Sequence, residues 1–246
     1  MDVTILFPVL NERLRLEKGI EKAVGYIRKN IESPCRLIIV DNGSTDETPR
    51  IAGRLCEKYE EVSYVRIRER GVGAALRKGI ALNKSDIVGY MDIDLSADIR
   101  HLGQALHILE TCPEIDYING TRFGRGSETR GRKWYRRITS RGLLLLLKAV
   151  FGMRCTDAVC GFTFVRKQTA QQLAATCSRE NGWFYTIEFL LRAERMGVSI
   201  LDLPVKWQED YDTTVRVWKT IKNYLIQTAR LKREFWKEDR KNAEKN

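Results

Sequence analysis

Residues 36–46 have the sequence RLIIVDNGSTD, an apolar run that ends in a cluster of turn-forming residues. Buried strands are about four to eight residues long and are bounded by such clusters, so the run predicts a strand. Apolar residues at helical spacing follow over residues 45–59 and predict a helix directly behind the turn. A strand, a tight turn and a helix form half of a βαβ unit.

The same alternation extends to both sides of this unit. Strands are predicted over residues 3–7, 36–40, 62–67, 87–91 and 116–119, and helices over 13–30, 45–59, 72–82 and 99–109. Repeated alternation of this kind predicts an α/β fold with a mostly parallel, Rossmann-like sheet flanked by helices. In such folds ligands bind beyond the carboxyl ends of the strands, so the polar residues that end each strand are the first candidates for a site.

The pattern changes after residue 120. Residues 120–133 are rich in Gly, Arg and Ser and predict a loop, and further elements follow less regularly. We predict helices over 134–151 and 187–196, strands over 161–166 and 198–205, and one or two basic helices at the end of the chain. The predicted organisation is one domain over 1–212, with halves 1–120 and 121–212, and a basic amphipathic helical segment over 213–246.

Composition excludes several classes of protein. The chain has 246 residues, 43% of them hydrophobic, which argues against disorder. Six dispersed cysteines without a Cys-x-x-Cys motif argue against a zinc site, and the absence of an export signal predicts reduced thiols. Lys148 interrupts the longest apolar run, Leu143–Leu147 with 149–151, which is too short to span a bilayer.

The net charge of +11 is concentrated in two segments. Residues 121–154 hold ten Lys and Arg and one acidic residue, and residues 213–246 hold ten Lys and Arg and four acidic residues. Such segments favour anionic partners, among them polyphosphates, anionic lipid and nucleic acid. A solvated basic face would also explain the second segment.

Carboxylates end three of the predicted strands. Glu12 follows the first strand, Asp41 ends the second, and Asp92 and Asp94 follow the fourth. Alternate residues of an extended segment point to one side, so the Asp-x-Asp pair suits a hard divalent cation. Ser44 or Thr45 would cap the following helix, but capping does not explain Asp41. Gly71 and Gly73 lack the third glycine of a dinucleotide-binding motif, so we interpret them, with Arg70, as a backbone approach to a phosphate or base.

These motifs together resemble the inverting glycosyltransferases of GT-A fold, in the family that includes cellulose synthases and dolichyl-phosphate sugar synthases. The matching segments are 8–12, 41–46, 70–73 with Gly79, 92–94, 120–123, 157–162, 187–190 and 203–207. The Cys-Gly-Phe segment at 160–162 is most similar to dolichyl-phosphate glucosyltransferases. His101 and His107 lie on a predicted surface helix and receive no role.

The resemblance implies a nucleotide-sugar half over 1–120 and an acceptor half over 121–212. Nucleotide-sugar contacts would come from Pro8, Asn11, Glu12, Asp41, Asn42, Arg70, Gly71 and Asp92, and Mg²⁺ or Mn²⁺ would be held by Asp92 and Asp94. Arg122, Arg136, Arg137 and Ser140 would bind an acceptor phosphate. The catalytic set would be Asp94, Arg122, Asp157 and Glu188, with Asp157 as a sugar-hydroxyl or metal-side residue and only secondarily a base. Asn42 stands where many members have a second aspartate.

The expected reaction is transfer of a hexose from a nucleotide sugar, UDP-glucose or a related UDP-sugar being favoured, to polyprenyl or dolichyl phosphate. The alternatives are a GDP-mannose-dependent enzyme, which Ser96 in place of the usual Gln disfavours, and a transferase acting on a glycan or soluble acceptor. A nucleic-acid-binding module would not explain the carboxylates, so we expect no nucleic-acid partner. We expect a peripheral protein at the cytoplasmic face of a membrane. The leucines of 143–147 and the aromatic residues of the tail would lie in the interface, and the alternative for the leucines is a place in the core.

Overall fold

The computed structural model describes residues 1–209 and 217–244. The described residues divide into two compact units: a sheet unit, formed by residues 1–132 and 155–209, and a helical unit, formed by residues 133–154 and 217–244. The sheet unit contains β1 (Val3–Val9), α1 (Leu16–Asn30), β2 (Cys35–Asp41), α2 (Thr48–Lys58), β3 (Val62–Arg66), α3 (Val72–Leu82), β4 (Ile87–Met91), α4 (His101–Thr111), β5 (Tyr117–Thr121), β6 (Glu128–Arg130), β7 (Phe162–Arg166), α6 (Lys167–Thr176), α7 (Phe184–Arg195), β8 (Ile200–Pro204) and β9 (Lys206–Gln208). The helical unit contains α5 (Trp134–Phe151) and α8 (Val217–Ala243).

The main sheet has seven strands in the order β3-β2-β1-β4-β7-β5-β8. All neighbours are parallel except the two pairs that include β7. Because β7 runs in the opposite direction, Met91 at the carboxyl end of β4 pairs with Phe162 at the start of β7. The segment that leads into β7 therefore reaches the edge where the parallel strands end. β6 and β9 form a separate two-stranded sheet.

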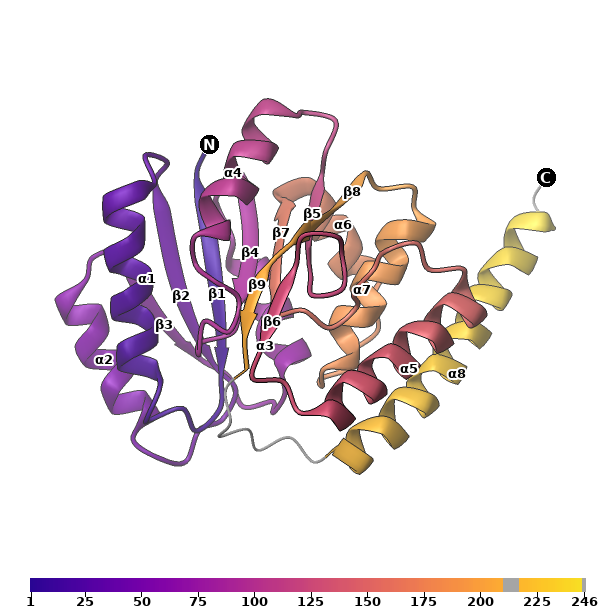
Figure 1. Ribbon diagram of the computed structural model, residues 1–246, viewed down its shortest axis with the longest axis horizontal. Coiled ribbons are helices and arrows are strands. Elements are labelled where there is room, and N and C mark those ends of the chain that lie inside the picture. Colours follow the sequence, from indigo (N-terminus) through magenta and orange to yellow (C-terminus); the bar gives the residue numbers. More distant parts are fainter. Residues whose placement is uncertain (210–216, 245–246) are drawn as a thin grey trace. The chain divides into compact units, whose positions relative to one another are not determined.

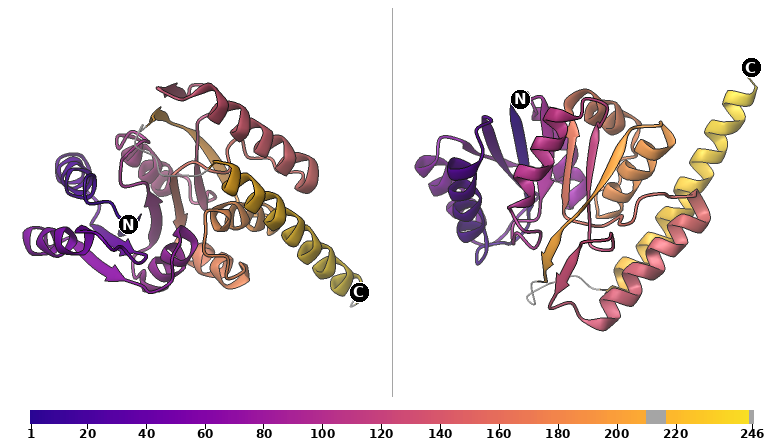
Figure 2. Two further views of the ribbon diagram at one scale, coloured as in Figure 1. Left: turned by 90° about the horizontal axis from the view of Figure 1, so that it is seen from below. Right: turned by 45° about the horizontal axis from the view of Figure 1, so that its top comes forward.

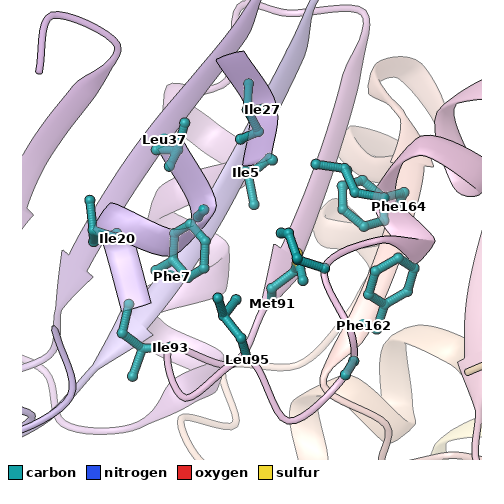
Figure 3. Packing of buried hydrophobic residues seen from close by; sticks show 14 of the residues in the cluster. Ile5, Phe7, Ile20, Ile27, Leu37, Met91, Ile93, Leu95, Phe162 and Phe164 are labelled. Carbon is teal, nitrogen blue, oxygen red and sulfur yellow. The ribbon is translucent and has the colours of Figure 1, made fainter. Parts of the chain in front are cut away.

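Helices cover both faces of the main sheet (Figure 1, Figure 2). Val3, Ile5, Phe7 and Val9 alternate along β1 and pack with the apolar faces of α1, α2 and α4 in one core cluster (Figure 3). Leu6 points the other way, toward a small cavity that α3, α6 and α7 line. The alternation of side chains along a strand thus places a helical layer on each face.

The predicted α/β fold is confirmed, and the differences are local. Helix α2 begins at Thr48 rather than at residue 45, and α7 begins at Phe184 rather than at 187. The predicted loop over 120–133 contains β6, whereas α6 and β9 were not predicted. The prediction that His101 is a surface residue is wrong: it is 9% exposed, and its Nε2 accepts the backbone N–H of Lys206 at 2.8 Å.

The two helices of the helical unit pack against each other. The rings of Phe151 and Phe235 meet edge to face at 5.6 Å, and Lys232 Nζ donates to the carbonyl oxygen of Val150 at 2.8 Å. The predicted leucine run divides between two environments, because Leu147 is buried whereas Leu145 is 67% exposed. No helix within residues 1–209 and 217–244 is long and apolar enough to cross a membrane. The side chain of Trp218, one of the predicted interfacial residues, lies outside the described residues.

Candidate active site

The Asp-x-Asp segment forms a tight turn directly after β4. The backbone N–H of Leu95 donates to the carbonyl oxygen of Asp92 at 3.0 Å, and that of Ser96 donates to Asp94 Oδ1 at 2.8 Å. Leu95 has a φ of 51°, a left-handed conformation that an L-residue adopts at a cost. These contacts fix the backbone between the two carboxylates, which remain half-buried.

The environment of Asp92 opposes its negative charge. Burial raises the pKa of Asp92 to about 7, and the carboxylates of Asp94 and Glu12 add to the effect, while Arg122 and Arg15 act against it. The described residues contain no group of three or more acidic, histidine or cysteine side chains suited to a metal. Two carboxylates are nevertheless enough for a Mg²⁺ or Mn²⁺ ion that completes its shell with substrate phosphates and water, so the donor set fits such an ion.

The raised pKa of Asp92 gives a testable pH dependence. Between about pH 4 and pH 7, folded Asp92 retains a proton that the unfolded chain has released, so the stability of the metal-free protein should fall as the pH rises through this range. Urea unfolding in EDTA at pH 5 and pH 7.5 measures this difference. The D92N variant should lose less stability than the wild type over the same interval, and an equal loss in both proteins would contradict the assignment.

Asp41 has a structural explanation that was not predicted from the sequence. Its Oδ1 accepts the backbone N–H groups of Gly43 and Ser44 at 3.1 and 2.7 Å, and its Oδ2 accepts the hydroxyl of Tyr64 at 2.7 Å. Asp41 is fully buried. Asp41 does not cap α2, as expected, but its carboxylate closes the turn after β2.

The turns after β1 and β2 are joined by side chains. Asn11, at a φ of 58°, donates its backbone N–H to Ser44 Oγ at 2.9 Å, and its Oδ1 accepts the N–H of Thr45 at 2.8 Å. We predicted that Ser44 or Thr45 would cap the following helix, but the hydroxyl of Ser44 accepts the backbone N–H of Asn11. The N–H of Thr48 donates to Asp46 Oδ1 instead. Glu12 joins the same assembly, since its N–H donates to Thr48 Oγ1 at 2.8 Å, while Pro8 lies within β1 beside Val40.

Asn42 connects two loops through both ends of its amide. Its Nδ2 donates to the carbonyl oxygen of Val9 at 2.9 Å, and its Oδ1 accepts the N–H of Gly71 at 3.1 Å. An aspartate could accept from Gly71 but could not donate to Val9, because an ionised carboxylate only accepts. These contacts explain why an amide stands at this position.

Gly71 and Gly73 make room for another part of the chain. A Cβ at Gly71 would overlap the carbonyl oxygen of Asn181, and a Cβ at Gly73 would overlap that of Glu180. The N–H of Gly73 donates to the carbonyl oxygen of Asn181 at 2.8 Å. Packing of residues 180–182 therefore explains both glycines without a phosphate. Arg70 lines an open depression of about 540 Å³ with Gly43, Arg66, Ile67 and Arg68.

Arg122 and Asp157 form a buried ion pair. Arg122 Nε donates to Asp157 Oδ2 at 2.7 Å and Nη2 donates to Oδ1 at 2.9 Å, with side-chain exposures of 5% and 1%. Burial opposes the charge of Arg122, but the neighbouring carboxylate outweighs it, so the pKa of the guanidinium is raised. Among the described residues Nη1 has no hydrogen-bond partner, which leaves this nitrogen for a ligand.

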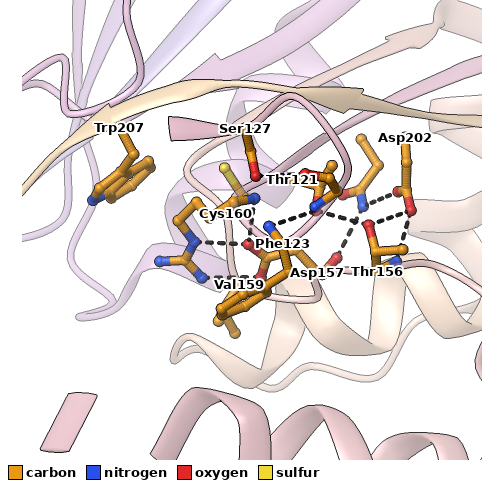
Figure 4. Close-up of polar contacts among 12 residues, drawn as sticks. Thr121, Phe123, Ser127, Thr156, Asp157, Val159, Cys160, Asp202 and Trp207 are labelled. Carbon is orange, nitrogen blue, oxygen red and sulfur yellow. Dashed lines mark hydrogen bonds and ion pairs between the residues drawn. The ribbon is translucent and has the colours of Figure 1, made fainter. Parts of the chain in front are cut away.

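A polar network around Asp202 and Thr156 adjoins the ion pair and was not predicted from the sequence (Figure 4). Asp202 Oδ2 accepts the N–H and the hydroxyl of Thr156 at 2.6 and 2.7 Å, and Asp202 Oδ1 accepts Asn119 Nδ2 at 2.7 Å. The hydroxyl of Thr156 also donates to Thr121 Oγ1. The network fixes the residues on either side of Arg122 and Asp157. Its one signal in the sequence is the charged Asp202 inside an apolar strand.

The remaining predicted site residues lie elsewhere. Glu188 in α7 is fully buried, and its carboxylate accepts the N–H and hydroxyl of Ser178 and Nε of Arg192. These contacts explain Glu188 structurally and leave it no exposed oxygen. Arg136, Arg137 and Ser140 lie on α5 in the helical unit, and their assignment to an acceptor phosphate stays a prediction.

A mostly parallel seven-stranded sheet flanked by helices matches the GT-A fold of glycosyltransferases. Residues 4–173 match the model described as "Glycosyl transferase family 2". The chain belongs to this family of enzymes.

Its relatives include dolichyl-phosphate beta-glucosyltransferases. The chain is 28% identical over 221 residues to the dolichyl-phosphate beta-glucosyltransferase of Mus musculus, a match that covers 84% of this chain and 67% of the relative. It is 26% identical over 238 residues to the glycosyltransferase AglD of Haloferax volcanii, a match that covers 96% of this chain but only 37% of AglD. The chain thus spans little more than a third of that relative's length.

Solved structures share the fold. Glucosyl-3-phosphoglycerate synthase from Mycobacterium tuberculosis, in complex with Mn²⁺, UDP and glucosyl-3-phosphoglycerate, superimposes with a TM-score of 0.69 at 19% identity, and the match covers 94% of this chain and 79% of that one. The same enzyme with Mg²⁺ and UDP gives a TM-score of 0.66 at 17% identity, over 92% and 79% of the two chains.

Proposed function

We propose that this chain transfers glucose or a related hexose, with inversion, from a UDP-sugar to dolichyl or polyprenyl phosphate. The observation that carries the proposal is the placement of Asp92 and Asp94 at the same sheet edge as the Arg122–Asp157 pair. The dolichyl-phosphate beta-glucosyltransferases among the relatives support the lipid acceptor. The UDP complexes of the structural neighbours support the donor.

The roles of the residues follow from their contacts. Asp92 and Asp94 would hold Mg²⁺ or Mn²⁺, and the ion would neutralise the charge of the departing diphosphate. Arg66, Arg68 and Arg70 supply positive charge around the depression beyond β2 and β3, where the nucleotide would bind, with Asp41 and Asn42 keeping the adjoining turns in place.

The acceptor requires positioning rather than a strong base. A phosphate monoester has a second pKa near ~6, so it is already an anionic nucleophile at neutral pH. Arg122 would bind it through Nη1 while Nε and Nη2 remain on Asp157. Both oxygens of Asp157 are occupied by donors, so this carboxylate orients Arg122 and removes no proton.

A transfer assay tests the proposal. The protein is incubated with Mn²⁺, radiolabelled UDP-glucose and polyprenyl phosphate. In parallel reactions radiolabelled GDP-mannose replaces the donor, or 3-phosphoglycerate replaces the acceptor. We expect the label to enter the organic phase only with UDP-glucose and lipid phosphate. A labelled product confined to the aqueous phase with 3-phosphoglycerate would establish the soluble-acceptor alternative, which the phosphoglycerate-using neighbours make the principal rival.

We also propose that the helical unit places the enzyme at the cytoplasmic face of a membrane. Residues 133–154 and 211–246 hold 16 Lys and Arg against five Asp and Glu, which gives this part of the sequence a net charge of +11. This value equals the net charge of the whole chain. Trp134, Ile138 and Leu145 share one face of α5 at helical spacing and are 74%, 61% and 67% exposed. Leu225 and Trp236, three turns apart on α8, are 52% and 56% exposed. Exposed apolar side chains among cations suit an anionic lipid interface.

Vesicle binding tests this second proposal without any substrate. Replacing Leu145 and Trp236 by Gln should lower partition onto phosphatidylserine-containing vesicles by roughly tenfold, because each change removes apolar area from the interface. Leu14, which is 81% exposed in the sheet unit, supplies the matched control L14Q. Cosedimentation in low and high salt measures the effect. If the variant with both Leu145 and Trp236 replaced binds the vesicles as strongly as the control L14Q, the helical unit is excluded as the docking surface.

A further inference from the structure

Trp207 connects the metal-binding turn to the acceptor side of the candidate site. It lies in β9, opposite Thr129 of β6, and forms an isolated bridge with Ala97. On either side of it, the N–H of Gln208 donates to the carbonyl oxygen of Ser96 at 2.8 Å, and the carbonyl oxygen of Lys206 accepts the N–H of Asp98 at 2.9 Å. These bonds attach β9 to the residues that directly follow Asp94.

The indole of Trp207 covers the Arg122 guanidinium. The guanidinium carbon lies 4.9 Å from the centre of the ring, and Trp207 is only 8% exposed (Figure 4 includes Trp207 and Asp157). Its Nε1–H donates to Glu209 Oε2 at 3.2 Å, which fixes the plane of the indole. Asp157 binds one edge of the Arg122 guanidinium, and the nearer of its two aromatic neighbours is the indole, since the ring of Phe123 lies 5.7 Å away. These contacts together determine the direction of Nη1.

We infer that Trp207 is a positioning residue for recognition of the acceptor phosphate, acting through Arg122. The inference rests on the proposed function, in which Arg122 Nη1 meets that phosphate. An aromatic face is required because it attracts the delocalised guanidinium and sets its plane, which an aliphatic side chain of similar burial does not do. Since β9 is attached to the turn after Asp94, the same residue keeps the acceptor-binding nitrogen in register with the metal-binding pair.

The W207L and W207F variants separate positioning from simple core packing. The KM for polyprenyl phosphate should rise about tenfold in W207L, because the nearer of the two cation–π contacts of Arg122 is lost and only that with Phe123 remains. The KM for UDP-glucose should stay within about twofold of wild type. W207F retains an aromatic face and should recover most of this loss.

Phe164 belongs to the same core cluster and is fully buried, so F164L is the control for a core truncation. It should lower the melting temperature without changing the acceptor KM. An unchanged acceptor KM in W207L, or equal impairment of W207F and W207L, would overturn the inference.

Calorimetric binding of a short isoprenyl monophosphate gives a readout that does not depend on turnover. Wild-type protein should bind it, and W207L should bind about tenfold more weakly. If wild type binds the monophosphate but transfers no sugar to it, and W207L binds about tenfold more weakly, the proposed function fails while the role of Trp207 stands. If wild type transfers sugar and W207L binds the monophosphate as tightly, only the inference fails.

Discussion

Replacing Gly161 by alanine should reduce sugar transfer about 100-fold while leaving the protein folded. A Cβ at this position would overlap the carboxylate of Asp92, whose backbone N–H donates to the carbonyl oxygen of Gly161 at 3.3 Å. The carboxylate is the mobile end of a short side chain, so it can move aside without disturbing the core. A displacement of about 1 Å in a catalytic group is enough to lower the rate by roughly that factor.

Three measurements test the effect of G161A: transfer rate, Mn²⁺ affinity by calorimetry, and melting temperature. We expect the first two to fall together and the third to change by only a few degrees. G53A is the matched control, because a Cβ at Gly53 in α2 meets nothing within 4 Å, and alanine favours a helix interior. Wild-type Mn²⁺ affinity in G161A would refute the assignment of Asp92 to the metal.

The strands could be predicted because their signals are local. β1, β2 and β4 are buried on both faces by helices, so each contains a continuous apolar run. The first polar residues after these runs are Asn11, Asp41 and Asp92. β9 has only three residues, and its pairing with β6 and Ala97 comes from distant parts of the chain. No pattern within its own sequence indicates a strand.

The candidate site was predictable as a set of residues but not as a set of contacts. Arg122 and Asp157 were each identified singly, with separate roles in phosphate binding and sugar or metal contact. Their pairing depends on the antiparallel direction of β7, which brings residues 157–161 to the edge where the parallel strands end. The start of α2 was misplaced for a similar reason: Asn11, from another turn, holds Thr45 outside the helix.

Removing one partner of the Arg122–Asp157 pair should destabilise the protein strongly. Substituting Asp157 by Asn leaves Arg122 as an unpaired charge in a buried position, and breaking a buried pair in this way lowers the free energy of unfolding by about 3–5 kcal/mol. D98N is the control, because Asp98 pairs with an Arg100 side chain that is 71% exposed. An exposed pair contributes at most about 1 kcal/mol. Urea unfolding of both variants measures the difference.

The double variant R122M/D157L decides what the pair is for. Apolar residues of similar volume can replace a buried ion pair at little loss of stability. Because Asp157 also accepts the backbone N–H groups of Arg122 and Val159 at 3.1 Å, the double variant should recover only part of the stability that D157N loses. It should nevertheless transfer no sugar to a lipid phosphate, since the guanidinium is gone. Partly restored stability without activity would assign the pair to acceptor recognition, and restored activity would contradict that role. A single R122A variant cannot make this distinction, because it leaves Asp157 buried and unpaired and so removes folding and function together.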